Sequence, residues 1–346
     1  MTLNHIKSRT HKILEAVILS YAESAVPVGS EYLWEKYRWG VSPATIRNTL
    51  AELESQGLIT HPHTSAGRVP TDLGYRYYAD LLMQPQRLRP EEEAGIESLA
   101  RIRTDDPFEL LDNAAQLLAE LTQEAGVVLV PQLSHAYFRQ FRLIQVGDQD
   151  WVGLLIASEG MIKHAALELH QPIALDLLER LERFLNEELS GMPLARIPDY
   201  LKNDFFRDAE QAFPSLPDEA LSWIQSGSLF EEEPEVILEG TSRMLEEPEF
   251  RDVQRTRRLL KGLERKADLV DILARDLAAD EVRFHIGSEN KGTLLTDCTI
   301  AAAPYRLKGG VMGTLGVIGP TRLNYPRVRT LVKKVAETLS RTQQDR

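Results

Sequence analysis

The sequence predicts an α+β protein of several domains, and three observations support this. The chain has 346 residues, more than one hydrophobic core usually supports. Its N-terminal residues alternate short amphipathic helices with tight turns and end in two short apolar runs. Further along, runs rich in Val, Ile and Leu between Gly, Asp and Gln alternate with longer amphipathic helices, as in antiparallel sheets covered by helices.

The composition is that of a folded, water-soluble chain. Apolar residues make up 43% and charged residues 27%, which argues against a disordered or fibrous protein. No apolar run reaches the length of a membrane span, and the N-terminus lacks the apolar stretch of a signal peptide, so we expect a cytoplasmic protein without membrane contact. The single cysteine, Cys298, excludes an internal disulfide and is expected to be buried.

The net charge of −12 is unevenly distributed along the chain. Residues 1–82 contain eight Lys and Arg and eight Asp and Glu, so this segment is neutral and the acidity belongs to the rest. Because electrostatic attraction depends on local patches, an acidic average does not exclude a nucleic-acid partner for the N-terminal segment.

Three short helices are expected before residue 57. The first lies between Ile6 and Ala22, and the second is SEYLWEKY with Ser30 as its N-cap. The third begins at Ser42-Pro43, an N-cap followed by proline at the first helical position, and stops at Gly57. Helices of this length and spacing are typical of a helix-turn-helix, whose last helix enters the major groove of DNA.

The outer face of the third helix carries side chains suited to reading DNA. Arginine bonds to guanine or phosphate, asparagine to adenine, and the threonine methyl group contacts the methyl of thymine. An ordinary solvated helix face is the alternative for these residues. The candidate contacts on this helix are Ser42, Thr45, Arg47, Asn48 and Thr49.

A hairpin of two short strands is expected directly after this helix, and it would form the wing of a winged helix-turn-helix. Leu58-Ile59 starts the first strand, HPHTSAG makes the turn, and Arg68-Val69 starts the second. The turn contains His63 and Thr64, and we expect Arg68 at the tip, in contact with the sugar-phosphate backbone or the minor groove. An exposed loop arginine is the alternative. His61 and His63 lack further ligands, so no metal site is predicted.

Several strings resemble one known family, the HrcA heat-inducible transcription repressors. They are VPVGS, GVSPATIRN, LAELESQGLI, HPHTSAGRVPTDLGYRYYADLLM and GVIGPTRLNY, in this order. The resemblance implies a homodimeric repressor of a CIRCE-type inverted-repeat operator upstream of chaperone operons, with the GroE chaperonin promoting its active form. It also implies a GAF-like domain interrupted by an inserted α/β dimerising domain.

The expected domain organisation combines this resemblance with the pattern along the chain. A proline-punctuated linker follows the N-terminal helices, and the strand-like runs at 126–157 are expected to join the C-terminal strands in one antiparallel sheet. The expected parts are a winged helix at 1–83, a linker and helix at 84–104, the GAF-like domain at 105–190 and 279–346, and the inserted dimerising domain at 191–278.

Two other classes of function compete with the repressor interpretation. An enzyme needs a convergent nucleophile, base and orienting group, and no spacing ties His164, His170, His285 and Cys298 together, so no enzyme and no cofactor are predicted. A small-ligand-gated winged-helix regulator, with the GAF-like domain as sensor, remains the alternative.

Two further patterns have ordinary structural interpretations. Tyr75, Tyr77 and Tyr78 are expected to pack their helix against neighbouring elements rather than to stack on bases. Heptad-spaced residues between Val253 and Leu277 indicate a long helical stripe, for which packing within a domain and subunit contact are both open.

Overall fold

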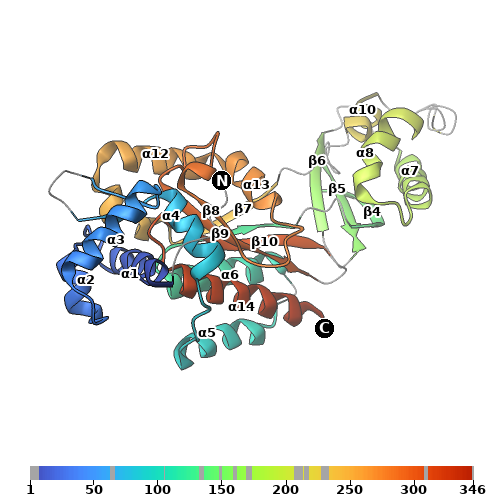
Figure 1. Cartoon of the computed structure of the whole chain (residues 1–346). Coiled ribbons are helices and arrows are strands. Elements are labelled where there is room, and N and C mark those ends of the chain that lie inside the picture. Colours follow the sequence, from blue (N-terminus) through green and yellow to red (C-terminus); the bar gives the residue numbers. More distant parts are fainter. Residues whose placement is uncertain are drawn as a thin grey trace. The chain divides into compact units, whose positions relative to one another are not determined.

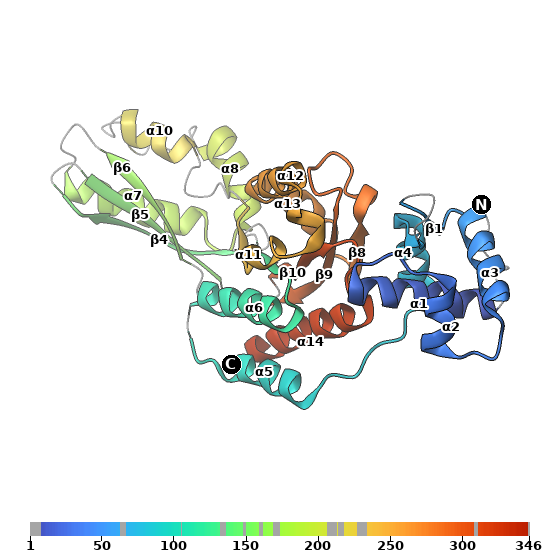
Figure 2. The ribbon, with the colours of Figure 1, turned by 90° about the vertical axis from the view of Figure 1, so that its left-hand side faces the viewer.

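The structure is a computed structural model in which two compact units are distinguished. Unit 1 comprises Met1–Val130, Glu235–Tyr305 and Gly313–Arg346, and unit 2 comprises Pro131–Pro234 and Arg306–Met312. Figures 1 and 2 show the chain in two views. The described residues are 8–62, 67–104, 106–131, 136–147, 150–158, 162–168, 174–205, 213, 218–226, 234–307 and 311–344.

Unit 1 opens with three helices and a two-stranded antiparallel hairpin. The hairpin pairs Ile59 with Pro70 and Thr60 with Val69, as the two apolar runs predicted. The expected cap at Ser30 is wrong: Gly29 is the N-cap residue, without a side-chain bond, and Ser30 is the first helical residue. The elements are α1 (Ser8–Ser24), α2 (Ser30–Tyr37), α3 (Pro43–Ser55), β1 (Ile59–Thr60), β2 (Val69–Pro70), α4 (Asp72–Tyr77) and the π-helical turn η1 (Tyr78–Leu82).

A five-stranded sheet forms the centre of unit 1, with the order β7-β3-β10-β9-β8. The pairs β3–β7, β3–β10 and β8–β9 are antiparallel, so strands from distant parts of the sequence meet here. The strands are β3 (Ala125–Leu129), β7 (Val236–Glu239), β8 (Arg283–Ile286), β9 (Cys298–Arg306) and β10 (Met312–Pro320).

Helices cover both faces of this sheet (Figure 1). On one face, alternate residues of β3 and β9 form a core with α12 and α13, and this core includes the buried Cys298 that the sequence predicted. On the other face lie α6 and α14, and α14 also packs against α5. These helices are α5 (Pro90–Arg101), α6 (Pro107–Thr122), α12 (Val253–Glu264), α13 (Lys266–Ala274) and α14 (Tyr325–Gln344), with the short α11 (Thr241–Met244), η6 (Pro248–Arg251) and η7 (Gly287–Glu289) between them.

Unit 2 contains a separate three-stranded antiparallel sheet with the order β4-β5-β6. One face of this sheet packs on helices around Phe141, Leu155 and Leu181, in a core of its own. Its elements are β4 (Phe138–Gln145), β5 (Asp150–Ala157), β6 (Ile162–Glu168), α7 (Leu175–Glu188), η4 (Leu194–Arg196), α8 (Ile197–Tyr200), η5 (Leu201–Phe205) and α10 (Asp218–Ser226).

The expected single sheet is therefore wrong. Of the strand-like runs at 126–157, only β3 joins the C-terminal strands, whereas β4 and β5 pair with β6 in unit 2. Alternation of apolar and polar residues identifies a strand but not its partner, because pairing depends on contacts between distant residues. The segment that leaves the five-stranded sheet covers residues 131–234, whereas the sequence suggested an insertion at 191–278.

The expected long helical stripe is also interrupted. Helix α12 ends at Glu264 and α13 begins at Lys266, with non-helical dihedral angles at Arg265. Val253 is 80% exposed and Leu260 is 41% exposed, so one of the two heptad stripes faces solvent rather than a core. Within the described residues, no helix is both long and apolar enough to cross a membrane.

Close packing of α6 on β3 gives the first testable prediction. A Cβ atom at Gly126 would lie 2.0 Å from the carbonyl oxygen of Ala115, so Gly126→Ala should lower the free energy of unfolding by about 1–3 kcal/mol. Gly95→Ala is the matched control. Gly95 lies in the interior of α5, and a Cβ atom there would be 3.4 Å from the nearest atom. This substitution should stabilise the helix by up to about 1 kcal/mol. Urea unfolding of both variants measures the difference, and equal stability would contradict the packing.

Candidate nucleic-acid interface

Helix α3 starts at a well-formed cap. The Ser42 hydroxyl accepts a hydrogen bond from the backbone N–H of Thr45 at 3.2 Å, and Pro43 occupies the first turn. The Ser42 and Thr45 hydroxyl oxygens are also 3.0 Å apart. These contacts confirm the predicted N-cap and fix the direction in which the helix leaves the preceding turn.

Two polar side chains on the outer face of α3 form no hydrogen bond or ion pair within the described part of the chain. Arg47 and Asn48 are exposed, opposite the buried Ile46, Leu50 and Leu53. Arg47 makes no ion pair within the described part of the chain. A free guanidinium and a free amide on a rigid, capped helix are groups that bond to base edges and phosphates.

Thr49 does not share this face, contrary to the expectation. It is 8% exposed, and its hydroxyl donates to the carbonyl oxygen of Thr45 at 3.2 Å. The position follows from helical spacing: Thr49 lies three residues after Ile46 and four before Leu53, both of which are buried. Thr49 therefore packs beneath the outer face.

The hairpin after α3 is joined on its turn side to the loop between α1 and α2. Val28 and Arg68 exchange backbone hydrogen bonds of 2.8 Å in an antiparallel bridge. A Cβ atom at Gly67 would lie 2.6 Å from the backbone of Pro27 and Val28, so this close approach requires glycine.

Arg68 directly precedes β2, on the turn side of the paired strand residues. Its Nε donates to Glu54 Oε2 at 3.0 Å, and its side chain is 23% exposed. Glu54, on the last turn of α3, also accepts from His61 Nδ1 at 2.8 Å. Residues 63–66 of the turn lie outside the described residues, so the expected tip position of Arg68 stays a prediction, whereas a free Arg68 guanidinium is contradicted by its pair with Glu54. His63 and Thr64 lie outside the described residues. No group of three metal-binding side chains is found among the residues the structure describes.

An aromatic cluster fixes the N-terminal segment on the rest of unit 1. Tyr75 stacks on Tyr325 with 5.4 Å between ring centroids, Tyr78 meets the same ring edge-on at 6.4 Å, and Phe284 lies 5.1 Å from it. Tyr75 and Tyr78 are 1% exposed. The expectation that these tyrosines pack rather than stack on bases is confirmed for all three, since Tyr77 is 4% exposed.

Polar contacts of helix α4 surround this cluster. The Arg76 guanidinium donates to both carboxylate oxygens of Glu289, at 2.8 and 2.5 Å, and to the carbonyl oxygen of Phe284. Asp72 accepts from the backbone N–H of Ser288 at 2.8 Å. Burial alone would raise the pKa of Glu289, but hydrogen bonds from Arg76 and from the Ile286 N–H outweigh it and lower that pKa.

A second tether joins the end of α1 to the segment before α12. Arg322 donates to the carbonyl oxygen of Ala22 at 3.0 Å and to Glu249 at 2.6 Å, and it also pairs with Glu247. Arg76 and Arg322 were not predicted from the sequence, because both act through contacts with residues far away in the sequence. The only signal for them was the family resemblance, whose strings GYRYYADLLM and GVIGPTRLNY contain Arg76 and Arg322.

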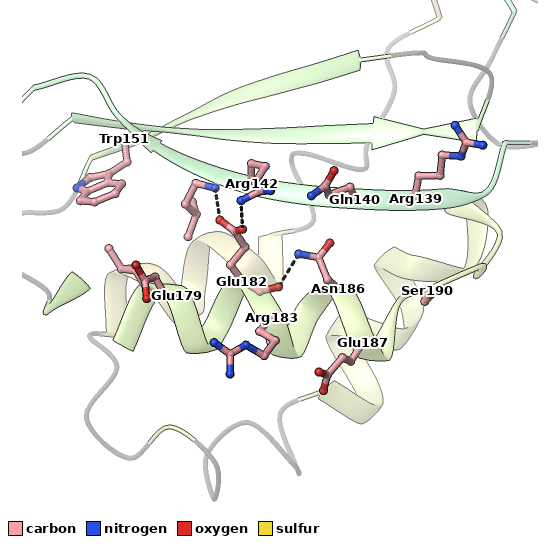
Figure 3. A pocket seen from close by; sticks show the side chains of 12 residues that line it. Arg139, Gln140, Arg142, Trp151, Glu179, Glu182, Arg183, Asn186, Glu187 and Ser190 are labelled. Carbon is pink, nitrogen blue, oxygen red and sulfur yellow. Dashed lines mark hydrogen bonds and ion pairs between the residues drawn. The ribbon is translucent and has the colours of Figure 1, made fainter. Parts of the chain in front are cut away.

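Unit 2 contains a cavity of about 920 Å³ between β4 and α7 (Figure 3). Figure 3 shows Glu182 and Asn186 reaching from α7 towards β4. Asn186 bonds to both backbone groups of Phe141, at 2.7 and 2.9 Å, and Glu182 accepts from the Leu143 N–H at 3.1 Å. These side chains cap a free sheet edge. Three arginines and three glutamates line the cavity, so its charge favours neither an anion nor a cation.

The buried carboxyl of Glu124 gives a pH-dependent prediction. Burial, and then the charge of Glu247, raise the pKa of Glu124, and its Oε2 has no hydrogen-bond partner among the described atoms. The carboxyl of Glu124 therefore keeps its proton in the folded state at pH values above about 4.3, where the unfolded chain loses it. The free energy of unfolding falls as pH rises from about 4.3 to the raised pKa of the folded state. Glu124→Gln should raise the unfolding temperature at about pH 7 and leave it unchanged at about pH 4.

Glu120→Gln is the matched control, because Glu120 is exposed on α6. Thermal unfolding of both variants at the two pH values checks the prediction. A Glu124→Gln variant that is less stable than the parent at neutral pH would show that the carboxylate is ionised and stabilising.

Comparison with known proteins agrees with this architecture. The family model described as "HrcA protein C terminal domain" matches residues 108–328. The "Heat-inducible transcription repressor HrcA" of Symbiobacterium thermophilum is 34% identical over 97% of this chain and 98% of its own length. The protein of that name from Syntrophobacter fumaroxidans is 34% identical, over 98% of this chain and 97% of its own.

One solved structure has the same fold. The "Crystal structure of a hypothetical protein at 2.2 A resolution" aligns with a TM-score of 0.61 and 22% identity, over 99% of both chains. The family model covers more than half of this chain, and the two full-length relatives exceed 30% identity. The chain therefore belongs to the HrcA family.

Proposed function

We propose that the chain is a heat-inducible transcription repressor that binds operator DNA through a winged helix-turn-helix at residues 1–83. This proposal rests on the capped helix α3, on whose outer face Arg47 and Asn48 are exposed and form no side-chain hydrogen bond or ion pair within the described residues. The hairpin β1–β2 would be the wing, and the relatives' names give the regulatory role. Residues 84–104 would be the linker and helix that follow.

Each candidate residue takes a distinct part in this proposal. Arg47 and Asn48 would contact base edges, and Ser42 and Thr45 would approach phosphates at the start of α3. His63 and Thr64 would contact the backbone from the hairpin turn. Arg68 would reach a phosphate only by releasing Glu54, and Thr49 would support α3 from within.

The operator would be a CIRCE-type inverted repeat read by a homodimer, since a two-fold dimer matches a two-fold sequence. The outward face of the sheet in unit 2 supports a subunit contact. Val152, Leu154 and Ile156 alternate on β5 with the core-facing residues and are half-buried, while Ile144 and Ile162 beside them are 46% and 62% exposed. An apolar strip of this kind suits a second copy of the same face.

The five-stranded sheet with its helices would be the GAF-like domain. Both of its faces are filled by side chains, because β9 and β10 are buried along nearly their whole length. This packing gives no support to the small-ligand-gated alternative or to an enzyme site there. The GroE chaperonin as activating partner and a cytoplasmic location follow from the family resemblance, and they belong to the same proposal.

The proposal is tested by gel shift with a duplex carrying the inverted repeat and a scrambled duplex, with and without GroE chaperonin. The parent protein should prefer the repeat, and chaperonin should increase the active fraction. Arg47→Ala should weaken binding to the repeat by about 1–3 kcal/mol and weaken binding to the scrambled duplex less, because the arginine would contact base edges.

Thr49→Val is the control in this experiment, because the buried threonine does not reach DNA: its DNA selectivity should stay as in the parent even if its stability changes. Equal binding of the parent to both duplexes would refute the repressor proposal.

The subunit contact is tested by placing charges on the strip. Ile144→Lys together with Ile162→Lys should raise the dimer dissociation constant at least about tenfold, or about 1.4 kcal/mol, since the charges would be desolvated in the contact. Phe108→Lys is a control at 48% exposure on α6. Sedimentation velocity over a concentration series measures the constants, and an unchanged dimer in the double variant would place the contact elsewhere.

A further inference from the structure

The segment around helix α12 carries a positive charge that the proposed function does not use. Residues 251–266 contain seven Lys and Arg against two Asp and Glu, a net charge of +5 in a chain whose total is −12. All seven cationic side chains are exposed: Arg251, Arg255, Arg257, Arg258, Lys261, Arg265 and Lys266.

These cations are almost entirely unneutralised. Within the described part of the chain, Arg258 pairs with Asp297 at 3.2 Å, and the other six form no ion pair. Elsewhere in unit 1 the arginines facing neighbouring elements are matched with carboxylates, as Arg76 and Arg322 are. A run of unpaired like charges raises the self-repulsion of the helix, so an anionic partner would relieve it.

Three of these cations form a continuous line. Arg257 and Lys261 lie four residues apart on one face of α12, opposite the buried Leu259 and Leu263, and Arg265 follows four residues later as the C-cap residue of the helix. Successive phosphates along a DNA strand present a similar line of negative charges, and lysine and arginine side chains bind them without regard to sequence.

The position of α12 is fixed relative to the N-terminal helices by the Arg322 tether. Arg322 donates hydrogen bonds to the carbonyl oxygen of Ala22 at the end of α1 and to Glu249 in η6. Helix α12 begins four residues after Glu249. In Figure 1 α12 lies on the same, left-hand side of unit 1 as α2 and α3, and Figure 2 shows α12 and α3 apart from each other on that side.

We propose that the exposed face of α12 with its C-cap, through Arg257, Lys261 and Arg265, is a second DNA-binding surface that contacts the phosphate backbone outside the sequence read by α3. This inference rests on the proposed DNA-binding function and extends it to the DNA that flanks the operator. The occupant is duplex DNA of any sequence, because the face offers flexible cations rather than groups arranged for base edges. At physiological salt charges act over about 8 Å, so the cations must be in contact with the backbone.

The test compares two variants with the same change in charge. In the first, Arg257, Lys261 and Arg265 are all replaced by Gln. In the control, Lys333, Lys334 and Arg341 on α14 are replaced by Gln; these residues are also exposed, and Lys334 lies 4.0 Å from Glu337. Thermal unfolding of both variants verifies that the fold is retained.

Binding is measured by fluorescence anisotropy at several salt concentrations. The duplexes are the inverted repeat alone, the repeat extended by about one helical turn, roughly 10 bp, on each side, and a scrambled duplex of the extended length. On both longer duplexes the α12 variant should lose affinity, with a salt slope reduced by up to about 2.7 if three phosphates are involved. On the short repeat it should bind like the parent protein, and the control variant should match the parent on all three.

Equal salt slopes for the parent and the α12 variant on the extended and scrambled duplexes would overturn the inference. A loss of thermal stability confined to the α12 variant would also overturn the inference. It would show that the three cations pair with carboxylates of the protein itself and are not available to DNA. These results are distinct from failure of the proposed function, which would appear as a parent protein that does not prefer the repeat. The scrambled duplex tests the α12 surface in that case as well.

Discussion

The contact between helix α4 and the five-stranded sheet is the constraint on which the use of the N-terminal helices depends. A helix can present side chains to DNA in a defined direction only if its own position is fixed. Tyr325 provides the fixed point, since its buried ring is bonded through its hydroxyl to Thr299 in β9 at 3.1 Å and packed against Tyr75 and Tyr78. Aromatic packing of this kind combines large apolar burial with a preferred geometry.

Polar groups around this contact determine how readily it opens. Arg76 and Arg322 each bind carboxylates and a backbone carbonyl oxygen, so separation of the N-terminal segment would leave several charged groups to be rehydrated. The hydration of charged groups becomes less favourable as temperature rises. Rehydration of the separated charges therefore compensates less for the loss of these ion pairs when the protein is heated. The buried oxygen of Glu249 that lacks a partner among the described atoms acts in the opposite direction.

The parts of the fold that could be predicted from the sequence are those set by neighbouring residues. The cap at Ser42 and the strands β1 and β2 were all predicted, because caps and hairpins are encoded within a few residues. Sheet membership could not be predicted in this way, and β4 and β5 were assigned to the wrong sheet. Thr49 was misplaced for a simpler reason: its polar hydroxyl suggested exposure, whereas the spacing from Ile46 already placed it on the buried face.

The Arg68–Glu54 pair shows why a candidate site cannot be evaluated from its charges alone. A sequence suggests a free arginine, but in the structure its guanidinium is satisfied by a carboxylate on α3. A phosphate that captured Arg68 would have to compete with Glu54 and would leave that carboxylate facing the negatively charged backbone.

The free energy gained in such an exchange is the difference between the Arg68–phosphate pair and the Arg68–Glu54 pair. This difference is small when both pairs are partly exposed. Arg47 and the cations of α12 have no such competing partner within the described residues apart from the Arg258–Asp297 pair. Attraction to phosphates at those positions is therefore not offset by the loss of an internal contact. A chain with a net charge of −12 can accordingly bind DNA where its cations are unpaired, while its paired cations maintain the fold.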